Sequence, residues 1–181
     1  KPSRETAPPL FDLTSLQRDA NRRFGWSARR TLNAAQRCYE GHKLLTYPRT
    51  DSRCLPNDYR ANVDEVLRAF AQTGPFQAEA THLIEKGLEN TERTFDDAKV
   101  SDHFAIIPTL IAPKHLSEIE QKLYDFVVRR FLAVFHPPAE FLVTTRITRV
   151  EGEPFKTEGK VLVEPGWLAV YGKEAAEENA S

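Results

Sequence analysis

The hydrophobic pattern changes at Pro137-Pro138, and this change constrains the fold more than any other feature of the sequence. Before the proline pair, apolar residues recur every three or four positions, which is typical of amphipathic helices. After it, residues 139–171 are rich in β-branched and aromatic side chains with Gly-containing turns between them, which is typical of strands. A second pair, Pro8-Pro9, precedes the first helical segment. The pattern predicts an α+β chain in which a helical body is inserted into β material.

This division predicts four parts. They are an incoming strand or linker at 1–13, a helical body at 14–136, returning strands at 137–173 and a polar tail at 174–181. Within the third part we expect strands at 140–150, 154–163 and 167–171. The two proline pairs lie where a hinge between the parts belongs, although two rigid linkers would look the same in sequence.

Capping signals mark the predicted helices. A capping-box pattern starts the first helix at Thr14, and Gly25 ends it. Ser27 is the expected N-cap of the second helix, whose apolar stripe ends at Tyr39. Later helices are expected to begin with Pro75 in the first helical position and with a capping box at Ser117.

Charge is distributed unevenly along the chain. The net charge is −1, but residues 1–60 carry 12 Lys and Arg against 6 Asp and Glu. The second predicted helix presents Arg29, Arg30 and Arg37 on its polar side, and the two first helices with their Gly-Trp-Ser turn resemble a helix-turn-helix. A basic segment suits a polyanion such as nucleic acid. A solvated face on two packed amphipathic helices explains the same pattern, so both interpretations stay open.

Other features narrow the class of protein. The chain of 181 residues can bury a core, and its apolar runs are too short to span a bilayer, so no membrane partner is expected. Cys38 and Cys54 lack metal-site spacing, and we interpret them as free thiols in a reducing compartment. The abrupt start and the absence of methionine suggest a fragment of a longer protein.

Residues 43–55, KLLTYPRTDSRCL, gather a tyrosine, two arginines and several hydroxyl groups. Pro48 keeps Tyr47 out of regular helix and places it on a turn. Arg49 and Arg53 are close enough in sequence to converge on one phosphate, which the planar guanidinium binds well. A tyrosine chosen at random packs in a core or on a surface far more often than it reacts, but this cluster also suits a nucleophile.

Neighbouring side chains add to that interpretation. Thr50 and Ser52 supply neutral donors, and Asp51 is suited to orient an arginine or cap a turn. A phenol with a pKa near ~10 needs an adjacent cation or base to attack phosphorus. Arg49 is the candidate for that cation, because it would stabilise both the phenolate and the charged transition state.

The segment LTYPRTDSRCLP resembles the active-site signature of type IA DNA topoisomerases, in the form found in the bacterial topoisomerase III branch. The preceding PPLFDLTSLQRDANRRFGWSARRTLNAAQRCYE is similar to the family segment that leads into the tyrosine. SDHFAIIPT resembles the downstream histidine motif, and FHPPAEF resembles the return to the family's arch-shaped β domain. The resemblance covers nearly the whole chain.

This resemblance implies an activity and a set of residue roles. Tyr47 would attack a single-stranded phosphodiester and hold the 5′ end, Arg49 would position the phosphate, and His103 would lie beside them. The helical part would be a winged-helix-like DNA-gate lobe. The DNA-binding residues expected in addition are Arg53, Thr50, Ser52, Arg29 and Arg30.

The resemblance also implies what other parts of the protein supply. Family members bind Mg²⁺ with carboxylates of an N-terminal Toprim-like domain that this sequence lacks, so we assign no metal site or cofactor to this chain. Its expected partners are single-stranded DNA and the remaining domains of the same protein. The expected location is the bacterial cytoplasm, at the nucleoid, and we expect the chain alone to be inactive.

Two other classes of protein remain as alternatives. In a helix-turn-helix-type nucleic-acid-binding module, Tyr47 would stack on a base and no bond would break. A structural insertion domain for protein assembly would explain the helices but not the polar cluster at one bend. Tyrosine recombinases fit less well, because their arginines and histidines precede the tyrosine, whereas the basic cluster follows it here.

Overall fold

The computed structural model describes residues 1–172 and residue 175. The chain divides into two compact units, one of residues 8–135 and one that joins residues 1–7 to the chain from His136 onward. The first unit is helical and the second contains the sheet, so the predicted α+β class is confirmed. Apart from residue 175, the expected polar tail at 174–181 lies outside the described residues, as does residue 173.

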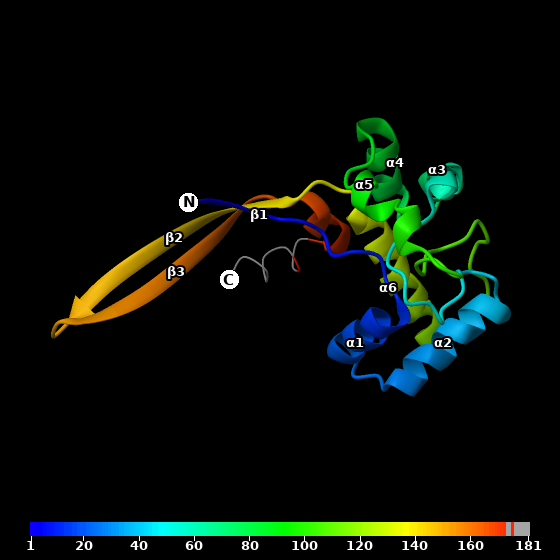
Figure 1. Cartoon of the computed structure of the whole chain (residues 1–181), viewed down its shortest axis with the longest axis horizontal. Helices are drawn as coiled ribbons and strands as arrows, with labels where there is room; N and C mark the ends of the chain where they lie inside the picture. Colours follow the sequence, from blue (N-terminus) through cyan, green and yellow to red (C-terminus); the bar gives the residue numbers. More distant parts are fainter. Residues whose placement is uncertain (173–174, 176–181) are drawn as a thin grey trace. The chain divides into compact units, whose positions relative to one another are not determined.

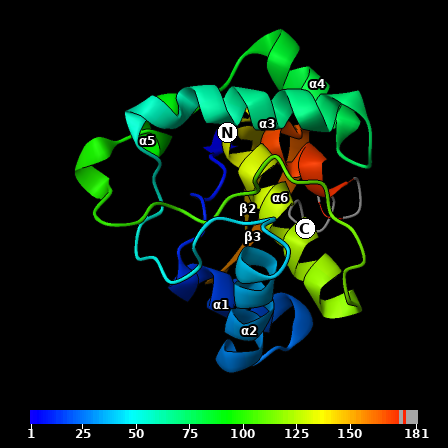
Figure 2. The same cartoon turned by 90° about the vertical axis from the view of Figure 1, so that its right-hand side faces the viewer.

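Helix α6 (Glu118–Val134) is the centre of the helical unit, since 10 of its 17 residues are buried. The α-helices described in the same unit are α1 (Leu13–Phe24), α2 (Ala28–Glu40), α3 (Arg60–Gln72), α4 (Gln77–Lys86) and the short α5 (Thr91–Thr94). Figure 2 shows α6 passing between the α1–α2 pair and the α3–α4 pair. None of the described helices is both long and apolar enough to cross a membrane.

Two of the predicted caps are confirmed. The Ser27 hydroxyl accepts a hydrogen bond from the Arg30 amide at the start of α2. Ser117 and Glu120 form the reciprocal capping box at the start of α6. The predicted end of α1 at Gly25 is also confirmed, because this residue adopts the left-handed conformation with φ 72°.

The cap predicted at Thr14 is wrong, and Asp12 holds that position. The Asp12 carboxylate accepts from the Ser15 amide at 2.8 Å, and the Asp12 amide donates to the Ser15 hydroxyl at 3.1 Å. This exchange satisfies two groups at the helix end, so α1 begins at Leu13 and encloses Thr14. The Asp12 carboxylate also pairs with Arg53, so it serves both the start of the helix and the tyrosine segment.

Pro75 is also not in the predicted first position of a helix. The turn before α4 closes with a hydrogen bond from the Gln77 amide to the Gly74 carbonyl, and Phe76 is the N-cap residue. The Phe76 ring is buried and packs at 6.0 Å from the Phe70 ring of α3. This aromatic contact shapes the connection between α3 and α4, so the helix starts two residues later than proline statistics suggest.

The sheet unit consists of β1 (Pro2–Glu5), β2 (Ala139–Val150) and β3 (Glu153–Glu164), antiparallel and in the order β1-β2-β3. The long β2–β3 hairpin is visible in Figure 1. Its two-residue turn places both Glu151 and Gly152 at positive φ, as a type I′ hairpin turn requires. The two predicted strands at 140–150 and 154–163 are therefore confirmed to within a residue.

The third predicted strand, 167–171, is wrong, because a 3₁₀ helix occupies Gly166–Tyr171. Gly166 has φ 53°, and a Cβ atom there would lie 2.3 Å from the Pro138 carbonyl oxygen. The chain turns closely onto the proline pair at this point, and the Trp167 indole donates to a carbonyl at the end of β1 at 2.8 Å. These long-range contacts select the helical turn over the strand that the apolar and aromatic residues favoured.

Both cysteines are buried and neither forms a disulfide, so the prediction of free thiols is confirmed. Burial, with the Glu120 carboxylate as a second cause, raises the pKa of Cys38 to about 12. The Cys54 thiol is held near the Arg93 carbonyl at 3.4 Å, and burial raises its pKa as well. Both side chains therefore act as small apolar groups in the core.

The Glu120 side chain joins α6 to α2. One carboxylate oxygen accepts from the Ser117 amide at 3.2 Å and contacts His42 Nε2 at 3.0 Å, while the other lies 3.4 Å from Arg37 Nε. Burial alone would raise the pKa of Glu120, but the hydrogen bonds from Ser117 and His42 outweigh it and hold the pKa below its ordinary value. Because His42 directly precedes residues 43–55, this carboxylate anchors the start of that segment.

We predict that this carboxylate makes stability depend on acid pH. Its unfolded pKa is near 4.5 and its folded pKa is lower, so the stabilisation is complete above pH 4.5 and is lost as pH falls through the folded value. Glu120→Gln should therefore flatten the fall in unfolding free energy between neutral and acid pH, measured by denaturant titration. Glu118→Gln, at an exposed pair with Lys122, is the matched control and should leave the pH dependence unchanged.

Candidate active site

Residues 43–55 lie beside residues 105–109, which are at least fifty positions further along the chain. Leu45 and Pro108 form an antiparallel bridge, and the Thr46 amide donates to the Ile107 carbonyl at 3.0 Å. These backbone contacts bring the tyrosine motif and the histidine motif together.

The Tyr47 ring contacts two other aromatic rings. The His103 ring lies with its centroid 4.2 Å away and its plane tilted by 36°, and the Tyr39 ring lies at 5.4 Å in an edge-to-face arrangement. Tyr47 is half-buried and His103 is exposed. The phenol ring is thus supported by two neighbours, and the imidazole beside it is open to an incoming ligand.

Arg49 is exposed two positions after the tyrosine, while the intervening Pro48 is buried. Among residues 1–172 and 175, Arg49 forms no hydrogen bond or ion pair. Its guanidinium is therefore open to solvent. A buried proline between an exposed arginine and a half-buried tyrosine holds their backbones at a constant spacing.

Arg53 is already engaged within the chain. Its Nε lies 3.3 Å from Asp12 Oδ2, and the Asp12 side chain also caps α1. Burial would raise the pKa of Asp12, but hydrogen bonds from Ser15 and the positive charge of Arg53 together hold it below its ordinary value. Arg53 thus links the end of the tyrosine segment to α1, with part of its side chain still exposed.

Thr50 and Ser52 are buried, with 6% and 5% of their surface exposed, and their hydroxyls serve the loop itself. Thr50 Oγ1 accepts from the Ser52 amide at 3.1 Å. The Ser52 hydroxyl donates to the Lys99 carbonyl at 2.7 Å and accepts from the Cys54 amide at 3.2 Å. Contact of these two hydroxyls with DNA stays a prediction, and their observed bonds shape the loop.

Arg29 and Arg30 are exposed in the first turn of α2, whereas Tyr39 is in its last turn. At 1.5 Å per residue, roughly 14 Å of helix separates Arg30 from the ring that touches Tyr47. Arg30 also lies over the Trp26 ring at 5.9 Å. The fold therefore does not bring these arginines to Tyr47, although they lie on the same helix as Tyr39.

Two side chains at this site were not predicted from the sequence as parts of it. Tyr39 was assigned only to the apolar stripe of its helix, and in the structure its ring also contacts the Tyr47 ring. The Thr46 hydroxyl makes two hydrogen bonds to residues 105–107. Helical spacing and the adjacency of Thr46 to Tyr47 were the available signals, but the contacts depend on segments distant in sequence.

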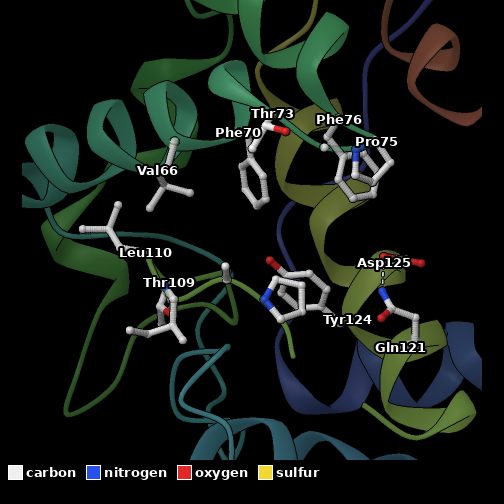
Figure 3. A pocket seen from close by; sticks show the side chains of 15 residues that line it. Val66, Phe70, Thr73, Pro75, Phe76, Thr109, Leu110, Gln121, Tyr124 and Asp125 are labelled. Carbon is white, nitrogen blue, oxygen red and sulfur yellow. Dashed lines mark hydrogen bonds between the residues drawn. The ribbon is translucent and has the colours of Figure 1, made fainter. Parts of the chain in front are cut away.

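A separate pocket of about 400 Å³ lies between the α3–α4 connection, α6 and the chain at 109–113. Figure 3 shows Val66 and Phe70 on one side and Tyr124 on the other, with Gln121 hydrogen-bonded to Asp125. Burial raises the pKa of Asp125. Tyr47, Arg49 and His103 do not line this pocket, so the candidate site is at the surface beside Tyr47 and not in this cavity.

We predict that Ser52 is a stability determinant. Ser52→Ala should lower the unfolding free energy by about 1–3 kcal/mol, because it leaves the buried Cys54 amide and the partly buried Lys99 carbonyl without their partner. Denaturant titration of the chain measures this loss. Ser101→Ala, at an exposed serine near the same loop, is the control and should change stability by less than about 0.5 kcal/mol.

Comparison with known proteins identifies the family of this chain. The sequence model of a family described as DNA topoisomerase matches residues 1–181. DNA topoisomerase 3 of Bacillus licheniformis is 47% identical over 167 residues, which cover 91% of this chain and 23% of that protein. DNA topoisomerase 3 of Bacillus subtilis is 45% identical over 175 residues, which cover 96% of this chain and 24% of that protein.

A solved structure gives the same fold. Full-length topoisomerase I of Thermotoga maritima matches with a TM-score of 0.66 and 23% identity, over 96% of this chain and 28% of that one. The chain spans about a quarter of the length of the curated relatives that it matches. The full-length family match and the identity to the Bacillus enzymes show that the chain belongs to the type IA DNA topoisomerases and is similar to their topoisomerase III members.

Proposed function

We propose that this chain is the strand-cleaving part of a type IA DNA topoisomerase. It would break one DNA strand through a 5′-phosphotyrosyl bond at Tyr47, allow another strand to pass, and reseal the break. The contact between the Tyr47 and His103 rings, with the exposed Arg49 two positions after the tyrosine, is the observation that supports the proposal most directly. The names of the Bacillus relatives agree with this activity.

The proposed reaction exchanges one phosphodiester for another. The Tyr47 phenol loses its proton as its oxygen bonds to phosphorus, the bond from phosphorus to the 3′ oxygen breaks, and that oxygen takes up a proton to become a hydroxyl. A phenolate is a good leaving group, so the same steps in reverse reseal the strand without a nucleotide cofactor. The reaction therefore relaxes or unlinks DNA with no net chemical change in the strand.

The side chains around Tyr47 would divide this work. Arg49 would bind the scissile phosphate and offset the negative charge of the transition state. His103 would contact the same phosphate or assist in moving the phenol proton, which its exposed position beside the ring permits. Arg53 would support the loop through Asp12 while its exposed atoms meet the strand. Arg29 and Arg30 would bind phosphates away from the break.

The family implies a Mg²⁺ ion, and the described residues do not fit one. Nowhere in residues 1–172 and 175 do three His, Cys, Asp or Glu side chains gather as ligands. When bound, such an ion would supply positive charge near the phosphate. We propose that its ligands belong to other domains of the same protein, which acts on single-stranded DNA in the bacterial cytoplasm, and we derive no step of the reaction through it.

We predict that Tyr47 is required for covalent attachment. This chain would replace the corresponding segment of the Bacillus subtilis topoisomerase 3, and the chimera would be incubated with labelled single-stranded oligonucleotide and Mg²⁺. A denaturant-resistant protein–DNA adduct should form with the natural residue and disappear with Tyr47→Phe, because the substitution removes only the hydroxyl. Tyr39→Phe is the matched control and should keep the adduct.

The same experiment separates the alternative function. In a helix-turn-helix-type module, Tyr47 would only stack on bases, and its phenylalanine variant would keep every activity. A chimera that folds and binds the oligonucleotide but forms no adduct with either residue would favour this binding module. The observation that favours this binding module is the exposure of Arg29 and Arg30 on a capped helix.

We further predict that the chain by itself does not relax DNA. Purified chain with Mg²⁺ and supercoiled plasmid should give no topoisomers on an agarose gel, because the metal ligands and the opposite side of the DNA gate are expected in other domains. Single-stranded oligonucleotide should still bind weakly. Robust relaxation by the chain alone, absent in Tyr47→Phe, would contradict the assignment of an essential part to those domains.

A further inference from the structure

The Thr46 hydroxyl connects the two motifs of the candidate site. It donates to the Ala105 carbonyl at 2.9 Å and accepts from the Ile107 amide at 2.9 Å. Thr46 directly precedes Tyr47, and Ala105 is two residues after His103. A single half-buried side chain thus joins the backbone next to the tyrosine to the backbone next to the histidine.

On the Tyr47 side, this pairing departs from a regular antiparallel ladder at the Thr46 carbonyl. In such a ladder, two facing residues exchange both of their N–H···O=C bonds. The Thr46 amide does donate to the Ile107 carbonyl, at 3.0 Å, but the Ile107 amide donates to the Thr46 hydroxyl and not to its carbonyl. The side chain therefore replaces the carbonyl, and regular pairing ends one residue before Tyr47.

The end of the pairing has a consequence for the tyrosine. A continued ladder would direct Tyr47 along the strand, whereas here the backbone is released into the Pro48 turn at the position where the phenol ring meets His103. The second bond of the hydroxyl, to Ala105, holds the His103 side of the contact as well. The backbone segments that carry the Tyr47 and His103 rings are thus both held by the Thr46 hydroxyl oxygen.

We propose that Thr46 is a positioning residue, whose hydroxyl sets the Tyr47 phenol against His103 and so controls the rate of strand cleavage without touching the DNA. The inference rests on the proposed function, since it concerns the same nucleophile. Reactive groups that are displaced by about 1 Å can lose about 100-fold in rate, so a lost bridge should act on cleavage far more than on binding.

The chain offers a control at the other end of the same pairing. The Thr109 hydroxyl donates to the Lys43 carbonyl at 2.6 Å and accepts from the Ile111 amide at 3.3 Å. It is a threonine of the same paired segments, with a comparable number of hydrogen bonds, but it lies on the far side of the Leu45–Pro108 bridge from Tyr47. Loss of the Thr109 hydroxyl therefore tests how a general weakening of the pairing affects the cleavage rate.

The experiment compares Thr46→Val, Thr46→Ser and Thr109→Val in the chimeric enzyme. Single-turnover rates of adduct formation and the dissociation constant for the oligonucleotide are measured separately, with thermal unfolding as a check of the fold. We expect Thr46→Val to cleave about 10- to 100-fold more slowly with affinity within about twofold of the parent. Thr46→Ser, which keeps the hydroxyl, should restore the rate to within about threefold, and Thr109→Val should cleave at nearly the parent rate.

Two results would contradict the inference. Equal loss of rate in Thr46→Val and Thr109→Val would show general destabilisation, and an unchanged rate in Thr46→Val would show that the bridge is dispensable. If Thr46→Val does not fold, Thr46→Cys, similar in size to serine and a weaker hydrogen-bond former, should give a rate between the serine variant and complete loss. An adduct that persists in Tyr47→Phe would overturn the proposed function itself, independently of Thr46.

Discussion

The backbone pairing between residues 44–46 and 107–109 is the constraint on which the candidate site depends. Neither segment belongs to a strand of the sheet, and the contact consists of an isolated bridge with hydrogen bonds around it. Sixty residues of helix and turn lie between the two segments, so closing this contact has a substantial entropy cost that the surrounding core must offset. Without the pairing, Tyr47 and His103 would be on unrelated loops.

The core that offsets this cost is built on α6. Its buried face carries Phe131 against Phe135, and its first turn presents Glu120 to His42 and Arg37. The tyrosine segment therefore leaves α2 from a fixed point. A second pairing, between Phe11 and Ile106, brings the start of the helical unit onto the histidine segment. The site is thus positioned by three distant parts of the chain, each tied to the next by backbone hydrogen bonds.

Polar side chains in the tyrosine motif divide into those that build the loop and those that stay exposed. Thr50 and Ser52 are buried with their hydroxyls bonded to the loop, and Arg53 is held by Asp12. Arg49 is exposed. The motif thus presents the exposed Arg49, and its buried neighbours keep the backbone in the shape that presents it. Spacing in the sequence could not separate the buried donors from the exposed one, because a side chain that bonds to the loop looks the same in sequence as one that faces solvent.

Local signals in the sequence were sufficient for the α+β class, for the caps at Ser27 and Ser117, for the β2–β3 hairpin and for the motif that contains Tyr47. These features depend on residues within a few positions of one another, where periodicity and turn chemistry act directly. The tertiary structure alone decided the helical turn at 166–171, which close packing at Gly166 imposes. It also decided the use of Thr46 as a bridge and the contact of Tyr47 with Tyr39, because contacts between distant segments leave no periodic trace in the sequence. The position of His103 beside Tyr47 was expected only from the family resemblance, and the structure supplies the ring contact itself.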